Sequence, residues 1–275
     1  MSNASSRRPL RVLRSATPKP SLSSGEVKKR WPGVVLAILL TAAVFIIGAT
    51  LGSLVISLLV SLTKQPGAQE TTLFGSAVLL QFAYATAVYG SMTAVLLWVL
   101  RWRRLNVGDL GFIKWPRWGD LVWAIVAFLS YMSLYVILLS VLKPLVPGLD
   151  TDQRQDIGFD GASGLSLVLV FCALAIIAPL AEELLMRGFL FTTLRRKMKF
   201  WLTALITSIV FASLHLTGGE SGAGLLWIAA VDTFILSIVL CYLREKTGRL
   251  WSGIAVHMIK NSVAFLMLFI VGSAG

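Results

Sequence analysis

Residues 164–194 read GLSLVLVFCALAIIAPLAEELLMRGFLFTTL and contain three charged side chains, Glu182, Glu183 and Arg187. A helix of this length, rising about 1.5 Å per residue, is longer than the roughly 30 Å hydrocarbon core of a bilayer. Because lipid cannot satisfy exposed backbone polar groups, the run predicts a membrane-spanning helix. A charge at the centre of such a helix costs about 2.5–3.5 kcal/mol on insertion scales, so the three charges should face other helices or a wet cavity.

Further apolar segments lie on both sides of this run. They are 31–62, 73–100, 118–142, 200–216, 222–243 and 250–272. The whole chain is 56% hydrophobic and 14% charged, whereas soluble domains carry roughly 25% charged residues. The sequence therefore predicts an all-α, polytopic transmembrane helix bundle of about seven spans. Segment 200–216 is near the short limit, and a break in the long segment 31–62 would give an eighth span.

The net charge of +12 is concentrated in the N-terminal tail and in alternate loops. The basic loops are 101–117, 195–199 and 244–249, and the intervening loops, 63–72, 143–163 and 217–221, are acidic or nearly uncharged. Cytoplasmic loops of membrane proteins carry the excess of Lys and Arg. We therefore expect a cytoplasmic N-terminus, a C-terminus on the opposite side and the lipid bilayer as partner. Because the positive charge follows topology, no nucleic-acid partner is expected.

Three regions follow from this pattern. Residues 1–30, rich in Ser and Arg, are expected to form a disordered basic cytoplasmic tail, although a transit peptide has a similar composition. Residues 31–163 should form N-terminal transmembrane helices, and 164–272 a second bundle. Gly48 and Gly52 form a GxxxG pair, a pattern that permits close helix packing.

Membrane-depth ionisable residues gather in the second bundle, where His215, Asp232, His257 and Lys260 join the three charges of 164–194. These include both histidines of the chain. One histidine in an apolar helix is usually a packing residue, but two at membrane depth beside other polar groups favour a functional site.

Helical spacing groups several of these side chains. Glu183 and Arg187 are four residues apart and can pair, whereas Glu182 points about 100° away from Glu183. Phe211 and His215 share one helix face, and a second face carries a similar pair, His257 and Asn261.

Three motifs in this order, Glu182-Glu183-x-x-x-Arg187-Gly188, Phe211-x-x-x-His215 and His257-x-x-x-Asn261, resemble those of a known family. It is the CAAX protease and bacteriocin-processing family of intramembrane endopeptidases, also called the Abi or type II CAAX prenyl endopeptidase family. Residues 242–257, YLREKTGRLWSGIAVH, also resemble the family segment before the last motif. The resemblance covers roughly 165–270, and the first 160 residues carry no recognised motif.

The resemblance implies an intramembrane protease that cleaves a membrane-associated peptide or protein. The depths of Glu182, His215, His257 and Asn261 below the basic ends of their spans, at about 1.5 Å per residue, are compatible with one site open to the cytoplasm. Glu182 would be the general base and His215 would help to hold the water. His257 and Asn261 would stabilise the oxyanion. Supporting roles fall to Glu183, Arg187 and Phe211, the last by packing.

The sequence leaves several alternatives open. The family resemblance favours a cofactor-free glutamate protease, but Glu182, Glu183, His215 and His257 could instead hold zinc. The substrate could be a prenylated CAAX protein or a leader or bacteriocin-type peptide. A non-catalytic scaffold of the same fold and an ion-coupled transporter are the other functions considered, and the absence of a visible inverted repeat counts against the transporter. The sequence assigns no role to Asp232 or Lys260.

Overall fold

All regular secondary structure in the described residues is helical. The computed structural model describes residues 29–63, 77–112, 115–146, 159, 162–216 and 225–271. Six helices are long and apolar enough to cross a membrane, and a seventh apolar helix is shorter. The predicted polytopic helical bundle is therefore confirmed. Of the predicted basic tail only Lys29 and Arg30 are described, and most of the acidic loop 143–163 also lies outside the described residues.

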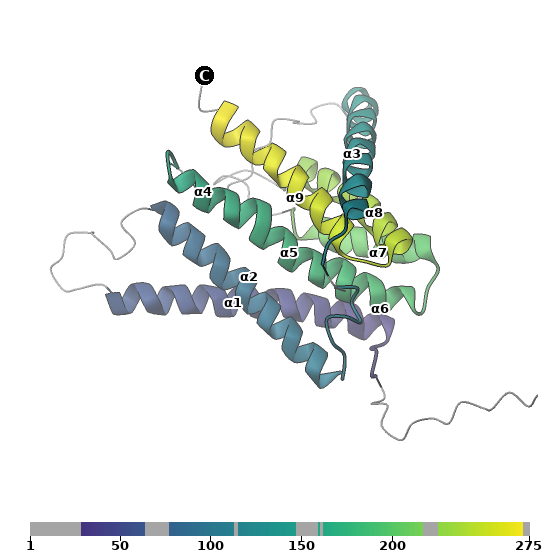
Figure 1. Ribbon diagram of the computed structural model, residues 1–275, viewed down its shortest axis with the longest axis horizontal. Helices are drawn as coiled ribbons and strands as arrows, with labels where there is room; N and C mark the ends of the chain where they lie inside the picture. Colours follow the sequence, from purple (N-terminus) through teal and green to yellow (C-terminus); the bar gives the residue numbers. More distant parts are fainter. Residues whose placement is uncertain are drawn as a thin grey trace, which may run out of the picture.

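Figure 1 shows the helices in chain order. They are α1 (Val34–Thr63), α2 (Ala77–Trp102), α3 (Trp118–Leu145), α4 (Ser166–Phe171), η1 (Cys172–Ile177), α5 (Ala178–Glu183), η2 (Leu184–Phe191), α6 (Thr192–Arg195), α7 (Phe200–Ser213), α8 (Trp227–Thr247), α9 (Trp251–Phe265) and η3 (Leu266–Val271). The elements from α4 to α6 form one continuous helix, Ser166–Arg195, which we call the fourth span. Because α1 is unbroken, the long first segment supplies one span and not two.

The fourth span contains two π-helical stretches, η1 and η2, on either side of α5. In η1 the Ala178 N–H donates to the carbonyl of Ala173, five residues earlier. The next residue, Pro179, has no N–H to donate. The carbonyl of Leu174 is thereby left without its usual helical donors. Wide turns of this kind are frequent at functional sites.

Helices α1 and α2 cross in close contact (Figure 1). A Cβ atom added at Gly52 would lie 2.5 Å from the Cα of Val88, and one added at Gly48 would overlap the backbone of Met92. No side chain fits in this space, so the GxxxG pair brings two backbones together.

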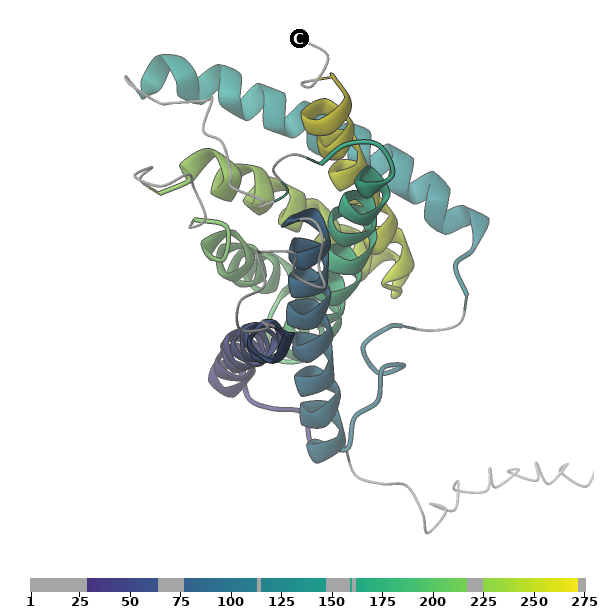
Figure 2. The same ribbon diagram turned by 90° about the vertical axis from the view of Figure 1, so that its left-hand side faces the viewer.

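Helix α3 lies at one edge of the bundle, and α1 lies at the opposite edge (Figure 1 and Figure 2). Only 11% of the most apolar stretch of α3 is buried, whereas 56% of that of α8 is buried. It packs on α8 and α9. Near its start, Asp120 accepts hydrogen bonds from Ser252 at 2.8 Å and from Arg249 at 3.1 Å. These contacts fix the first turn of α3 to the beginning of α9.

Candidate active site

Glu183 and Arg187 form a buried ion pair in the middle of the fourth span. Arg187 Nη1 donates to Glu183 Oε1 at 2.8 Å, and the side chains are 1% and 0% exposed. The guanidinium also lies 4.5 Å from the ring centroid of Phe211, which favours a cation–π contact. The pair predicted from the four-residue spacing is therefore present. Two charges at this depth are tolerable because each is neutralised by the other.

His257, on α9, lies between the two glutamates. Its Nδ1 is 3.1 Å from Glu183 Oε1, and its Nε2 is 3.7 Å from Glu182 Oε2. An ionised carboxylate can only accept hydrogen bonds, so the contact with Glu183 requires a proton on Nδ1. Nε2 then carries a proton only when the ring is an imidazolium. Glu183 is thus placed to orient the ring.

Glu182 differs from Glu183 in its access to open space. Tyr89, on α2, donates from its hydroxyl to Glu182 Oε1 at 2.9 Å. The Glu182 side chain is 14% exposed and borders a cavity of about 140 Å³, which offers room for several water molecules. The cavity is lined by Phe45, Tyr89, Met92, Glu182, Leu185, Met186, Phe211, Leu214 and His215. This carboxylate is therefore the one that water can reach.

His215 also lines the cavity, in the turn that follows α7. Its Nδ1 is 3.0 Å from the carbonyl oxygen of Phe211, and a carbonyl can only accept, so Nδ1 carries the proton. Nε2 of the neutral ring is then an acceptor. The imidazole packs edge-on against the Phe211 ring at 4.9 Å, and the same ring lies 6.0 Å from that of His257. Phe211 is 1% exposed, and its ring packs edge-on against both histidines.

Asn261 makes a contact that its spacing from His257 does not predict. Its amide donates to the carbonyl of Leu174 at 2.8 Å. This is the carbonyl that η1 and Pro179 leave without a helical donor. A primary amide has two N–H groups, and this bond uses one of them. Asn261 thus ties α9 to the fourth span and does not line the cavity.

Asp232 and Lys260 form a separate pair between α8 and α9. Lys260 Nζ is 3.0 Å from Asp232 Oδ2, and the hydroxyl of Tyr131, on α3, donates to Asp232 Oδ1. None of the three side chains lines the cavity. Through Tyr131, this cluster attaches α3 to α8 and α9 further along α3 than the contacts made by Asp120.

Of the four residues of the zinc alternative, His257 lies within 3.7 Å of both Glu182 and Glu183, and His215 lines the cavity that Glu182 borders. Within the described ranges, no group of three or more His, Cys, Asp or Glu side chains has an arrangement that could hold a metal ion. His215 and His257 each direct Nδ1 to a protein oxygen, at 3.0 and 3.1 Å.

Sequence reasoning missed Tyr89, which belongs to no recognised motif. Its partner Glu182 is 93 residues away, so no local pattern could name it. One signal was available, because a tyrosine deep in an apolar span needs a hydrogen-bond partner for its hydroxyl.

Comparison with known proteins places this site in a family context. Residues 164–263 match the sequence profile described as type II CAAX prenyl endopeptidase Rce1-like. The chain is 27% identical over 120 residues to the Bacillus subtilis (strain 168) protein named "Putative membrane peptidase YdiL", covering 44% of each chain. It is 29% identical over 102 residues to an Escherichia coli protein named "Uncharacterized 24.3 kDa protein", covering 36% of this chain and 44% of the relative. No solved structure matches significantly.

The chain therefore aligns with less than half of the length of either relative. The profile match includes all three motifs, from Glu182 to Asn261, and leaves α1 to α3 outside. The resemblance to the type II CAAX prenyl endopeptidase family is thus confirmed over residues 164–263.

Proposed function

We propose that this protein is an intramembrane endopeptidase in which Glu182 activates water to hydrolyse a peptide bond of a membrane-associated substrate. One observation carries the proposal. The Glu182 carboxylate, held by Tyr89, borders a cavity that His215 also lines, and His257 lies directly beside it. The family match and the name of the Bacillus subtilis relative support the same activity.

Two acceptors would hold the attacking water. In the described structure the Glu182 Oε2 atom has no hydrogen-bond donor, since His257 Nε2 is 3.7 Å away and beyond hydrogen-bonding distance. The unprotonated Nε2 of His215 is the second acceptor. A water that donates to both would present its oxygen lone pair to the substrate. As the bond forms, Glu182 removes one proton and the hydroxide attacks the carbonyl carbon.

Two donors would stabilise the tetrahedral oxyanion that results. Nε2 of His257, whose Nδ1 is oriented by Glu183, supplies one N–H in the imidazolium form of the ring. For the other donor the support is the family resemblance: Asn261 does not line the cavity, and its second N–H, beyond the one bonded to Leu174, would have to reach the oxyanion from α9. Donors fixed in this way stabilise developing negative charge strongly in a water-poor site. Glu182 then passes its proton to the leaving nitrogen, and the carbon–nitrogen bond breaks.

We propose further that the reaction needs no metal and that the N-terminus and the cavity opening face the cytoplasm. The support for orientation is the basic side chains at the start of α1 and the ends of α2, α6 and α8. The substrate would be a prenylated CAAX-type protein or a leader or bacteriocin-type peptide.

A cleavage assay on the purified protein in detergent tests these proposals. A farnesylated CAAX peptide and a panel of unprenylated peptides would be offered to wild type and to Glu182→Ala, each with and without a chelator. We expect cleavage by wild type under both conditions and none by the variant.

Three results would contradict parts of the proposal. Cleavage that survives Glu182→Ala excludes this residue as the base. Loss of activity in chelator that zinc restores shows metal dependence. If wild type cleaves nothing while still binding membrane proteins, a non-catalytic scaffold explains the fold better.

A further inference from the structure

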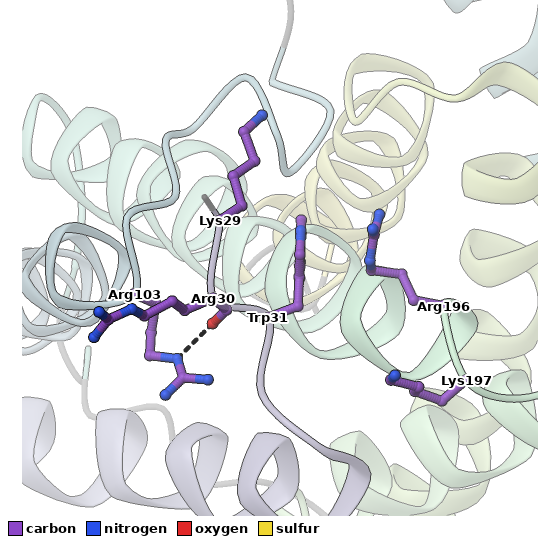
Figure 3. A pocket seen from close by; sticks show the side chains of 6 residues that line it. All are labelled: Lys29, Arg30, Trp31, Arg103, Arg196 and Lys197. Atoms are coloured by element: carbon purple, nitrogen blue, oxygen red, sulfur yellow. Dashed lines mark hydrogen bonds between the residues drawn. The ribbon is translucent and has the colours of Figure 1, made fainter. Parts of the chain in front are cut away.

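A basic pocket lies where α1 begins and where α2 and the fourth span end (Figure 3). It shares no lining residue with the cavity beside Glu182. Its volume is about 600 Å³. Three chain segments build it, namely the approach to α1, the end of α2 and the end of the fourth span. The lining residues are Lys29, Arg30, Trp31, Arg103, Arg196 and Lys197. Five of these six side chains are cationic, and none is acidic.

Specific contacts hold the segments together. The backbone N–H of Arg30 donates to the carbonyl of Arg103 at 3.0 Å, and Arg103 Nε donates back to the carbonyl of Arg30 at 2.6 Å. The guanidinium of Arg196 lies 4.7 Å from the ring centroid of Trp31 (Figure 3). The approach to α1 is thus fixed to both other segments.

The positive charge in the pocket is largely uncompensated. Among the residues that the structure describes, Lys29 is paired with the carboxylate of Asp109, and no ion pair involves the other four cations. Like charges gathered around a hollow repel one another and create a strong positive potential. An anion in the pocket would relieve this repulsion.

Membrane topology alone explains basic residues at these span ends but not their convergence. Arg30, Arg103 and Lys197 are far apart in sequence and could each extend into water separately. Instead, the hydrogen bonds between Arg30 and Arg103 and the contact of Arg196 with Trp31 hold the three segments around one pocket. The presence of three arginines, Arg30, Arg103 and Arg196, also matters, because the guanidinium plane matches the oxygen geometry of phosphate.

We propose that this pocket binds a phosphate group, supplied by the headgroup of an anionic phospholipid. This phospholipid would belong to the membrane leaflet that borders the start of α1 and the ends of α2 and the fourth span. Phosphates of that leaflet lie at this level, and Trp31 is the residue type enriched there. Basic pockets between spanning helices are suited to anionic headgroups. The bound lipid would link three helices, α1, α2 and the fourth span, whose side chains also line the cavity.

The experiment measures lipid binding by the full chain in detergent. Purified protein is titrated with short-chain phosphatidylglycerol, short-chain phosphatidylcholine or inorganic phosphate, with the melting temperature and lipid retention in native mass spectrometry as readouts. The variant Arg196→Gln/Lys197→Gln removes two lining charges. Its matched control, Arg101→Gln/Lys199→Gln, removes two exposed charges that lie two residues from lining positions but outside the pocket.

We expect phosphatidylglycerol to raise the melting temperature and phosphatidylcholine to leave it unchanged. The pocket variant should bind phosphatidylglycerol about tenfold more weakly than wild type, because it loses at least one charge-assisted hydrogen bond to the phosphate. The control variant should bind it as wild type does. An effect of inorganic phosphate as well would support recognition of the phosphate group itself.

Three results would overturn the proposal. These are equal binding of both lipids, equal weakening in pocket variant and control, or stabilisation by inorganic phosphate with none by the lipid. If the double variant does not fold, the single variants Lys197→Gln and Lys199→Gln give the same comparison.

Discussion

Two clusters of ionisable side chains share helix α9 but differ in what they leave open. In the peripheral cluster, Tyr131 and Lys260 occupy both carboxylate oxygens of Asp232. In the cavity cluster, Arg187 and His257 both contact Oε1 of Glu183, whose other oxygen is buried and has no hydrogen-bond partner among the described residues. The Oε2 atom of Glu182 also lacks a donor within hydrogen-bonding distance among these residues, but Glu182 borders the cavity. We infer that the carboxylate bordering the cavity is the reactive one, and that partial burial of a charge does not by itself identify a reactive site.

The largest expected effect is that of Glu182→Gln, which keeps the side-chain volume and the acceptor for Tyr89 but removes the base. Turnover of a cleavable peptide should fall by about 10²–10⁴-fold, the usual contribution of general base catalysis. The melting temperature should change little, because the lost charge borders a cavity. A variant with at least a tenth of wild-type turnover would assign the base elsewhere.

Removing the Asn261 amide should have the next largest effect. In Asn261→Ala, turnover should fall by about 10²–10³-fold, as for one lost oxyanion donor. The variant also loses the bond to Leu174, so unfolding must be measured beside turnover. A fall in stability with a wild-type turnover number would restrict Asn261 to joining α9 to the fourth span.

Tyr89→Phe should reduce turnover by about tenfold or more, because a hydrogen bond to a charged group contributes about 1.5–3 kcal/mol. The loss should appear in kcat, since Tyr89 positions Glu182 and need not bind substrate. Tyr84→Phe is a matched control on the same helix, where the hydroxyl is 3.4 Å from Ser53 Oγ. If Tyr89→Phe and Tyr84→Phe have the same kcat, Tyr89 does not position Glu182 for catalysis.

The smallest expected effect on turnover is that of Asp232→Asn, which should stay within about twofold of wild type because Asp232 lies outside the cavity. Stability should fall modestly, since removing one partner of this part-buried pair leaves the other charge uncompensated. The double variant Asp232→Asn/Lys260→Gln should regain part of the lost stability. If Asp232→Asn loses as much turnover as Glu182→Gln, the peripheral cluster is also needed for catalysis and the prediction is wrong.

Apolar segment length predicted most of the fold. The six spans coincide with predicted segments because hydrocarbon thickness sets a minimum helix length. Segment 200–216 gives a helix that ends at Ser213, so His215 lies in a turn and not within the helix. The pair of Glu183 and Arg187 was predictable because both belong to one helix and its geometry is local.

Contacts between helices were not predictable from spacing. The bonds from Tyr89 to Glu182 and from Lys260 to Asp232 depend on the relative rotation of helices, which no single helix encodes. The bond from Asn261 to Leu174 depends on the π-helical stretch before Pro179, where one extra residue per turn changes which carbonyl is free.

The glycines of α1 have a consequence for how mutations in this protein should be read. Gly52 touches the backbone of Val88, the residue directly before Tyr89 in α2. A methyl group at position 52 would push α2 outward and carry the tyrosine hydroxyl away from Glu182. A random mutagenesis screen for lost activity should therefore recover Gly48 and Gly52, although neither lines the cavity. Loss of activity in these variants would result from displacement of α2, so Gly48 and Gly52 should not be counted as catalytic residues.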